Sequence, residues 1–383
     1  MSSLVSHTVA HSESNDGFDY CLLGVVLALL GLGIVMVYSA TAINTSGGGA
    51  TAVLRQHVIY VLLGLMAMYG ASRIPVDWWY RSGKWLLGLV ILLLMLVIIP
   101  AIGIEVNGSR RWIPVGPVRM QPAELAKLVM VIYAAGYLTR KQELLKEFRH
   151  GVVGISVVIV AVAGLLLWEP DFGSFVVIAI TLFTMMFLAG ARITHFMLCA
   201  TVGAASMAAL TIMSPYRMQR VLSFLNPWSD PFDSGFQLSQ ALIAFGRGEW
   251  FGVGLGASIQ KLFYLPHASN DFLLAVIGEE LGLLGVVTVL LAFATLVWRA
   301  FAIARRAETS GQLFAARLAQ GVGLLLGYQA MINIGVNMGV LPTKGLTLPF
   351  LGYGGSSLVI CCAAAGLLLA VDATARAQPR RAQ

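Results

Sequence analysis

Three carboxylates at the start of an apolar stretch are the side chains in this sequence best placed to do chemistry. Asp271 opens the run DFLLAVIGEELGLLG, and Glu279 and Glu280 follow within it. Charges are costly at membrane depth, so each is a functional hypothesis by default. On a helix, Asp271 heads a stripe of small residues that includes Gly278 and Gly282, and such a stripe packs against another helix, not lipid. We therefore expect Asp271 to face the protein interior or an aqueous cavity.

Two further readings apply to these acids. Asp271, or Asn270 before it, can instead cap the helix by accepting a hydrogen bond from its first turn. Capping and catalysis are compatible, because a carboxylate at a helix amino end is held ionised by the helix dipole. Glu279 and Glu280 lie about 12 Å further along by helical rise. We expect both glutamates to be structural, paired with a cation such as Lys127 or Lys344.

A second group of candidates is basic and aromatic, in the segment IEVNGSRRWIPVGPVRMQPAELAKL. Arg110, Arg111 and Arg119 fall on the side of the membrane that normally carries few positive charges. Guanidinium groups suit the oxygens of a phosphate or pyrophosphate, with Trp112 beside them at the interface. Contact with lipid headgroups is the simpler alternative.

Glu124 and Lys127 close that segment and stand three residues apart on an expected helix. At this spacing they can form a structural ion pair. If one of them is unpaired, it is expected to face the cavity.

The segment from Leu341 to Ser357 contains two prolines and several glycines. Irregular backbone at membrane depth is tolerated only where it is buried in protein or lines a water-filled cavity. Lys344 could then meet a phosphate, and Ser356 stands where the next helix starts. A simple turn is the alternative.

The composition is that of a polytopic membrane protein. The chain has 383 residues, of which 58% are hydrophobic and 11% charged, with a mean hydropathy of +0.82; a soluble domain has about 25% charged residues. The net charge of +7 is scattered over short loops, which indicates membrane topology and no nucleic acid partner. Neither the four cysteines nor the six histidines show metal-ligand spacing, so no metal is identified from them.

Ten apolar runs approach the roughly 20 residues that cross a bilayer. They cover residues 20–40, 57–72, 84–103, 122–138, 151–168, 173–190, 194–213, 271–298, 314–340 and 356–374. We predict an all-α polytopic integral membrane protein with ten transmembrane helices, comprising a tail at 1–18, a membrane domain at 19–374 and a tail at 375–383. A large extracytoplasmic loop, residues 214–270, separates the seventh and eighth helices and should be folded, with an amphipathic stretch at 237–245.

An even number of spans places both termini on one side. The tails and the loops of that side hold 15 of the 25 Lys and Arg residues, which assigns them to the cytoplasm.

Four stretches resemble the SEDS family, in the same order and along nearly the whole chain. They are RWIPVGPVRMQPAELAKL, FLNPWSDPFDSGFQLSQALIAFGRGEWFGVGLGASIQKLFYLP, DFLLAVIGEELGLLG and GVLPTKGLTLPFLGYGGSS. The long-loop stretch is more similar to the cell-division branch of that family than to its elongation branch.

The resemblance implies a peptidoglycan glycosyltransferase of the bacterial inner membrane that polymerises lipid II at the division septum. Implied partners are a class B penicillin-binding protein, which is the septal transpeptidase, and other divisome membrane proteins. The catalytic acid of the family maps onto Asp271, and its basic motif positions map onto Arg111, Arg119 and Lys127. The family usually reads close to LPEAHTDF, whereas HASN follows Pro266 here, so the resemblance assigns no role to side chains 267–270.

Chemistry and resemblance together predict an inverting transfer. The sugar hydroxyl of the acceptor attacks the anomeric carbon of the donor, with Asp271 as general base. Arg111, Arg119, Lys127 and Lys344 are candidates for stabilising the departing lipid pyrophosphate, alone or with a divalent cation such as Mg²⁺ or Mn²⁺. A retaining route needs a second carboxylate about 5 Å away, and this helix offers none so close. A lipid II flippase, an elongation-type polymerase and a division scaffold are the alternatives.

Overall fold

The computed structural model describes residues 19–42, 49–106, 108–116, 118–230, 235–262, 265, 268–343 and 345–377. Its α-helices are α1 (Tyr20–Thr41), α2 (Gly49–Arg73), α3 (Val76–Ile98), α4 (Pro122–Arg140), α5 (Val153–Trp168), α6 (Phe172–Leu188), α7 (Ile193–Ile212), α8 (Pro215–Leu225), α9 (Phe236–Gly248), α10 (Leu273–Thr309), α11 (Leu313–Asn337) and α12 (Gly355–Ala377). A 3₁₀ turn, η1 (Gln142–Lys146), and a π turn, η2 (Phe148–Val152), join α4 to α5.

Each of the ten predicted apolar runs overlaps a helix, namely α1 to α7 and α10 to α12. Within the described residues, six helical stretches are long and apolar enough to cross a membrane: those of α1, α2, α3, α10 and α12, and the continuous η2–α5 stretch. Helices α6 and α7 are apolar but shorter over their described parts. The chain is therefore a predominantly helical multi-pass membrane protein, and the count of ten spans stays a prediction. The third helix begins at Val76, eight residues before the predicted run, because the break falls at Pro75.

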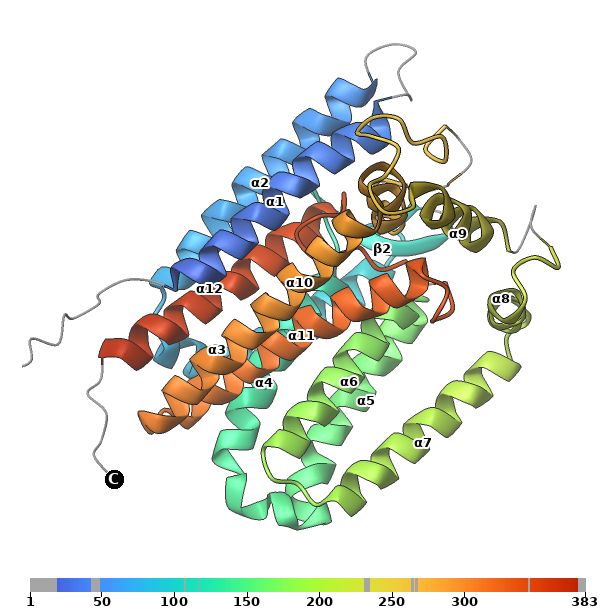
Figure 1. Cartoon of the computed structure of the whole chain (residues 1–383). Helices are drawn as coiled ribbons and strands as arrows, with labels where there is room; N and C mark the ends of the chain where they lie inside the picture. Colours follow the sequence, from blue (N-terminus) through green and yellow to red (C-terminus); the bar gives the residue numbers. More distant parts are fainter. Residues whose placement is uncertain are drawn as a thin grey trace, which may run out of the picture.

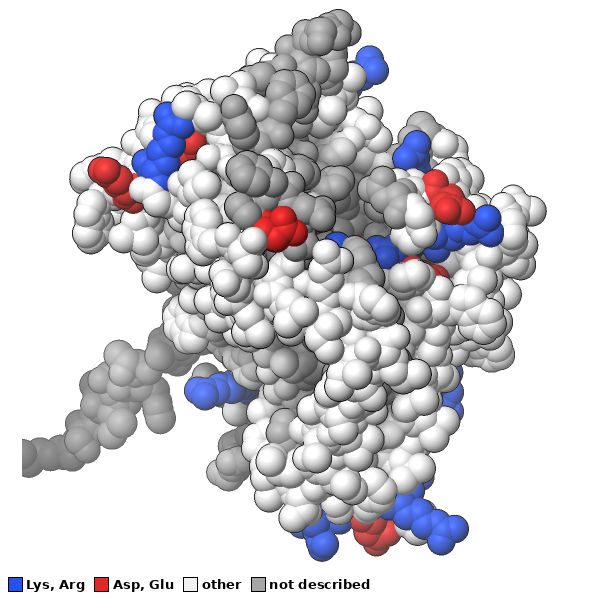
Figure 2. All heavy atoms as spheres, turned by 90° about the vertical axis from the view of Figure 1, so that its right-hand side faces the viewer, with Lys and Arg blue, Asp and Glu red and all other residues white. Residues whose placement is uncertain are grey.

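The long helices run side by side as a bundle, and α7 stands apart from it (Figure 1). Helix α2 packs along α12, α10 along α11, and α3 along α4. The sheet and helices α8 and α9 gather at one end of the bundle, here called the sheet end. On the face drawn in Figure 2, a broad band with few charged side chains separates those of the upper part from those at the lower edge, as expected for a membrane-embedded surface.

The all-α prediction was wrong for residues 104–120, which form a three-stranded antiparallel sheet. The strands are β1 (Ile104–Val106), β2 (Ser109–Val115) and β3 (Val118–Met120), in the order β1-β2-β3. Gly108 and Gly116, with φ of 74° and 60°, sit in the two hairpin turns, where positive φ favours glycine. Glu105 faces Arg110 across the first hairpin and pairs with it at 3.3 Å.

The described parts of the predicted loop 214–270 are folded, as expected. The amphipathic stretch at 237–245 lies in α9, which confirms that prediction, whereas α8 was not foreseen. Helix α9 packs against the first part of α10.

Helix α10 is broken at Gly282, whose φ of 65° and ψ of −163° are not helical. The segment 249–254 enters the break and pairs the backbone groups that it frees. Val253 and Gly254 donate their N–H groups to the carbonyls of Glu279 and Glu280, at 2.9 and 3.1 Å. In the other direction, the N–H groups of residues 283 and 284 donate to the carbonyls of residues 249 and 250, at 2.9 and 3.2 Å.

The stripe of small residues on α10 therefore permits close packing, but its partner is only partly a helix. A Cβ atom added at Gly278 would meet the ring of Phe245 on α9 at 2.4 Å. One added at Gly282 would meet the backbone of Trp250 and Gly252 at 2.4 to 2.6 Å. The prediction of a helix partner holds for Gly278, whereas Gly282 packs against the inserted segment.

The opposite end of the bundle is held by buried charges. Asp19 caps α1 and binds Arg299 of α10, with Nε at 3.0 Å, and Arg306 at 3.2 Å. Arg306 also binds Asp372 of α12. This network ties α1, α10 and α12 together far from the sheet end.

Candidate functional site

A cavity of about 620 Å³ opens at the sheet end, where segments distant in the sequence meet. Its lining comes from β1 and β2, the start of α4, the turn before α6, helices α8 and α9, and the loops that lead into α10 and α12. The lining residues are Val106, Ser109, Arg111, Trp112, Gln121, Glu124, Pro170, Asp171, Phe172, Gly173, Ser174, Ser214, Arg220, Gln237, Asn270, Asp271, Phe272, Gly345, Leu346, Thr347, Tyr353, Gly354 and Ser357. The lining is thus mixed, polar and aromatic.

Asp271 lies in the wall of this cavity, two residues before α10 begins. This agrees with the prediction that Asp271 faces the protein interior or an aqueous cavity. The capping alternative is wrong, because the residue at the N-cap is Phe272 and no side chain of the N-cap residue bonds the first turn. A Cβ atom at Gly345 would lie 3.3 Å from Oδ2 of Asp271, so the loop before α12 passes directly beside the carboxylate.

The electrostatics of Asp271 favour a proton acceptor. Burial raises the pKa of the Asp271 carboxyl from 3.8 to about 7, and the positive charge of Arg220 opposes that rise. A pKa close to neutrality is the value at which a general base is most effective. Arg220 comes from α8 and also donates to the carbonyl of Thr343 at 3.1 Å. It was missed in the sequence because α8 was assigned to a loop.

The predicted basic cluster is only partly assembled around the cavity. Arg111 and Trp112 line it, but the Arg111 guanidinium also donates to the carbonyls of Glu169 and Pro170, at 3.0 and 2.7 Å. Arg119 lies on β3 with an exposed side chain and is not part of the lining. Lys344 lies outside the described residues.

Glu124 and Lys127 form the predicted ion pair, with Nζ and Oε1 at 2.9 Å. Both are buried on α4, and Lys127 is only 2% exposed. Lys127 also donates to Oε1 of Gln329 at 2.9 Å, which turns it away from the lining. Within the described residues Oε2 of Glu124 has no hydrogen-bond partner, and Glu124 lines the cavity.

Ser356 lies at the start of α12, as predicted, where its Oγ accepts the N–H of Gln121 at 3.2 Å. This bond joins the α12 loop to the start of α4. The neighbouring Ser357, not Ser356, lines the cavity.

Glu279 and Glu280 have buried structural contacts, as expected, but Lys127 is not their cation, because it pairs with Glu124, and Lys344 lies outside the described residues. Glu280 pairs with Lys261 at 2.7 Å, and it also accepts a hydrogen bond from the Ser39 hydroxyl of α1 at 2.7 Å. Glu279 accepts the backbone N–H groups of Ile259 and Gln260, at 3.0 and 3.3 Å. These carboxylates fold the loop before α10 against its first half.

The turn between α5 and α6 carries two acids that sequence reasoning did not assign. Asp171 lines the cavity, caps α6 through the N–H of Ser174 at 3.1 Å, and accepts from Gln121 at 3.1 Å. Glu169 is 2% exposed, and among the described residues neither of its carboxylate oxygens has a hydrogen-bond partner. Burial, with the charge of Asp171 adding to it, raises the pKa of Glu169 to about 8, opposed by Arg111.

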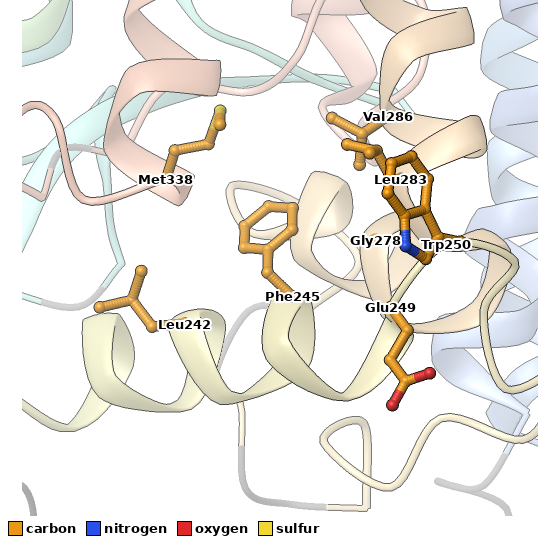
Figure 3. A pocket seen from close by; sticks show the side chains of 9 residues that line it. Leu242, Phe245, Glu249, Trp250, Gly278, Leu283, Val286 and Met338 are labelled. Atoms are coloured by element: carbon orange, nitrogen blue, oxygen red, sulfur yellow. The ribbon is translucent and has the colours of Figure 1, made fainter.

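A second cavity, of about 570 Å³, lies between α9 and the broken part of α10 (Figure 3). Leu242 and Phe245 face it from α9, and Leu283 and Val286 from α10. Glu249 is the only ionisable residue in the described part of its lining. The described lining therefore lacks the set of groups that a transfer reaction needs.

Across the described part of the chain, no group of three or more His, Cys, Asp and Glu side chains is arranged to hold a metal ion. Among the described residues, the positively charged side chains in the lining of the polar cavity are Arg111 and Arg220.

The fold and the site define a multi-pass membrane protein with a partly buried carboxylate in a polar cavity at one end of its bundle. Residues 20–377 match the family model described as cell cycle protein, FtsW/RodA/SpoVE, and the chain belongs to this family.

Relatives and solved structures agree with this assignment. The chain is 52% identical over 379 residues to a probable peptidoglycan glycosyltransferase FtsW of Nitrosococcus halophilus, covering 98% of this chain and 97% of the relative. It is 52% identical to the protein of the same name from Thioalkalivibrio sulfidiphilus, covering 90% and 87%. A chain of a peptidoglycan synthase complex that coordinates polymerization and crosslinking superimposes with a TM-score of 0.77 at 28% identity, covering 94% and 98%. The rod shape determining protein RodA of Thermus thermophilus gives 0.67 at 26%, covering 95% and 99%.

Proposed function

We propose that this protein is a peptidoglycan glycosyltransferase that polymerises lipid II at the outer face of the inner membrane. The observation that carries the proposal is the Asp271 carboxylate, which lines a polar cavity together with Arg111, Arg220 and Trp112. The relatives named as peptidoglycan glycosyltransferases, similar over nearly their whole length, support the same reaction.

In this reaction Asp271 accepts the proton of the acceptor's sugar hydroxyl. The freed oxygen attacks the anomeric carbon of the donor, the bond from that carbon to the phosphate oxygen breaks, and the lipid pyrophosphate leaves with the electron pair. A single carboxylate is sufficient for such an inverting displacement, because the pyrophosphate leaves as a stable anion and needs no general acid to protonate it. General base catalysis of this kind contributes about 100- to 10,000-fold in rate.

Charge that grows on the departing pyrophosphate needs cations already in place. Arg111 and Arg220 are the described candidates from the cavity lining, and Trp112 offers an aromatic face to the sugar. Lys344 stays a candidate from its sequence position next to Gly345. Arg119, which is not in the lining, is proposed to contact the substrate phosphates from the rim of the cavity. Lys127 is proposed to act indirectly, by holding Glu124 in the lining. A divalent cation such as Mg²⁺ or Mn²⁺ could supply further positive charge.

The site is proposed to open on the extracytoplasmic side, with both termini in the cytoplasm and with ten spans within residues 19–374. The protein would act at the division septum, because the relatives of 52% identity are named FtsW. A class B penicillin-binding protein, with other divisome proteins, is the proposed partner. The similar chain from a complex that coordinates polymerization with crosslinking supports a transpeptidase partner.

Purified protein reconstituted with lipid II and its cognate transpeptidase tests the proposal. Glycan polymer that forms with the native chain and disappears with Asp271→Asn is the expected result. Headgroup translocation without polymer would instead identify a flippase, and neither activity would identify a scaffold. Complementation of division-defective cells, but not of cells defective in elongation, tests the septal assignment.

A further inference from the structure

Three buried amide side chains follow one another along a single face of α11. Gln329, Asn333 and Asn337 are spaced four residues apart and are at most 2% exposed. Side chains at this spacing share a helix face. A buried amide is costly unless it is hydrogen-bonded, and the partners of these three lead directly to the site.

Asn333 joins the two loops that carry the cavity wall. Its Nδ2 donates to the backbone carbonyl of Asp271 at 2.8 Å and to that of Leu346 at 2.5 Å. Leu346 follows Gly345, the residue that passes beside the Asp271 carboxylate. One amide therefore fixes the distance between the acid and the loop opposite it.

Asn337 supports the same residue and also caps α10 from outside. Its Nδ2 donates to the Asp271 carbonyl at 2.8 Å, and its Oδ1 accepts the N–H of Ala275 at 3.2 Å. Ala275 is the third residue of α10, whose N–H is ordinarily bonded by the side chain of the N-cap residue. The N-cap here is Phe272, which has no side-chain acceptor. The side-chain amide of Asn337 thus accepts the hydrogen bond at the start of α10 that the Asp271 carboxylate would otherwise be free to accept.

We propose that Asn333 and Asn337 are positioning residues that hold the Asp271 backbone and occupy its neighbouring helix cap, so that the Asp271 carboxylate remains in the cavity. The inference rests on the proposed role of Asp271 as general base. Gln329 extends the device, because its Nε2 donates to the carbonyl of Thr347 at 3.3 Å in the same loop.

The chemical consequence concerns the basicity of Asp271. A carboxylate that accepts a backbone N–H is stabilised in its charged form and becomes a weaker base. Among the described residues, the ionisable side chains that line the cavity with Asp271 are Arg111 of β2, Glu124 of α4, Asp171 before α6, Arg220 of α8 and Tyr353 before α12. None of these changes when Asn337 is replaced, so a shift in the titration of Asp271 reports the loss of the cap.

The test measures Asp271 directly and not only through activity. Dicyclohexylcarbodiimide modifies protonated carboxyl groups. The full-length protein is labelled at a series of pH values and then digested, and mass spectrometry of the peptides gives the fraction of Asp271 that is labelled at each pH. In Asn337→Ala the N–H of Ala275 keeps only its bond to the carbonyl of Phe272, at 3.0 Å, and has room for a second acceptor. The Asp271 carboxylate can then take the place of the lost amide oxygen, so the labelling midpoint should fall by at least about one pH unit, a tenfold change in proton affinity. In Asn333→Ala the cap is intact, so the midpoint should stay while kcat falls about tenfold and KM for lipid II changes less than about twofold.

Gln312→Ala is the matched control. Gln312 is an amide of the same α11 region that donates to the carbonyl of Thr374 at 3.2 Å, away from the site. Its loss should change neither the midpoint nor kcat. If Asn337→Ala does not purify as a folded protein, Asn337→Ser, whose side chain is too short to reach the same N–H, takes its place.

An unchanged labelling midpoint and an unchanged kcat in both asparagine variants would overturn the inference. The proposed function fails separately, if Asp271→Asn retains full polymerisation. Labelling of Asp271 in the native and Asn337→Ala proteins would still decide the positioning role in that case.

Discussion

The sharpest prediction from the site is that the rate of polymerisation falls at low pH. Asp271 must be ionised to accept a proton, and its pKa of about 7 means that activity is present above pH 7 and is lost as the pH falls. By simple titration about half of the carboxyl is ionised at pH 7, about 9% at pH 6 and about 1% at pH 5. We therefore expect kcat/KM to fall about 50-fold between pH 7 and pH 5.

The measurement is the initial rate of glycan polymer formation at lipid II concentrations well below KM, in detergent with the cognate transpeptidase. Under this condition the pH profile reports groups of the free enzyme. Arg220→Gln provides an internal comparison, because loss of its positive charge should move this fall in rate to higher pH. An Asp271 with its ordinary pKa of 3.8 would be almost fully ionised at pH 5. A kcat/KM that changes less than about twofold from pH 7 to pH 5 would refute the reasoning.

The remaining predictions concern stability. Lys127→Met should destabilise the protein by about 3 to 5 kcal/mol, because it leaves Glu124 buried without its cation. The double variant with Glu124→Gln should recover much of that loss. Unfolding in detergent measures both. Gly282→Ala should prevent correct folding, because φ there is 65° and the added Cβ would meet backbone atoms at 2.4 Å. Size-exclusion chromatography should then show no monodisperse protein. Gly24→Ala, with open space around the added Cβ, should behave as the native chain. Glu169→Gln should raise the melting temperature increasingly from pH 5 to pH 8 and by a constant amount above that. The melting temperature rises because the pKa of Glu169, about 8 in the folded state, makes its ionised form costly there, and Gln carries no charge. Equal melting temperatures for the native and Glu169→Gln proteins at pH 8 would contradict this prediction.

The sequence was sufficient to locate the long apolar helices and the acid, because both depend on local signals. Runs of apolar residues predicted α1 to α7 and α10 to α12, and the isolated charge of Asp271 at the head of such a run indicated a site. The Glu124–Lys127 pair was predictable for the same reason, since three residues on one helix fix its geometry.

The rest of the site depends on contacts between distant segments, which spacing does not encode. Arg220 reaches the cavity because α8 crosses the sheet end, and Asn333 reaches Asp271 from a position 62 residues further along the chain. Lys261 became the partner of Glu280 because the chain folds back at the break in α10, a break that a stripe of glycines does not distinguish from close helix packing. The sheet escaped prediction because its strands are only three to seven residues long.

The insertion of residues 249–254 into α10 has a mechanical consequence. Pulling α9 away from α10 would strip four backbone hydrogen bonds in an apolar setting, where each unpaired group costs several kcal/mol. The stretch from α9 through the inserted segment to the first turns of α10 should therefore move as one piece. Its amide protons are expected to exchange with deuterium together. A displacement of α9 would therefore also displace the residues just before α10.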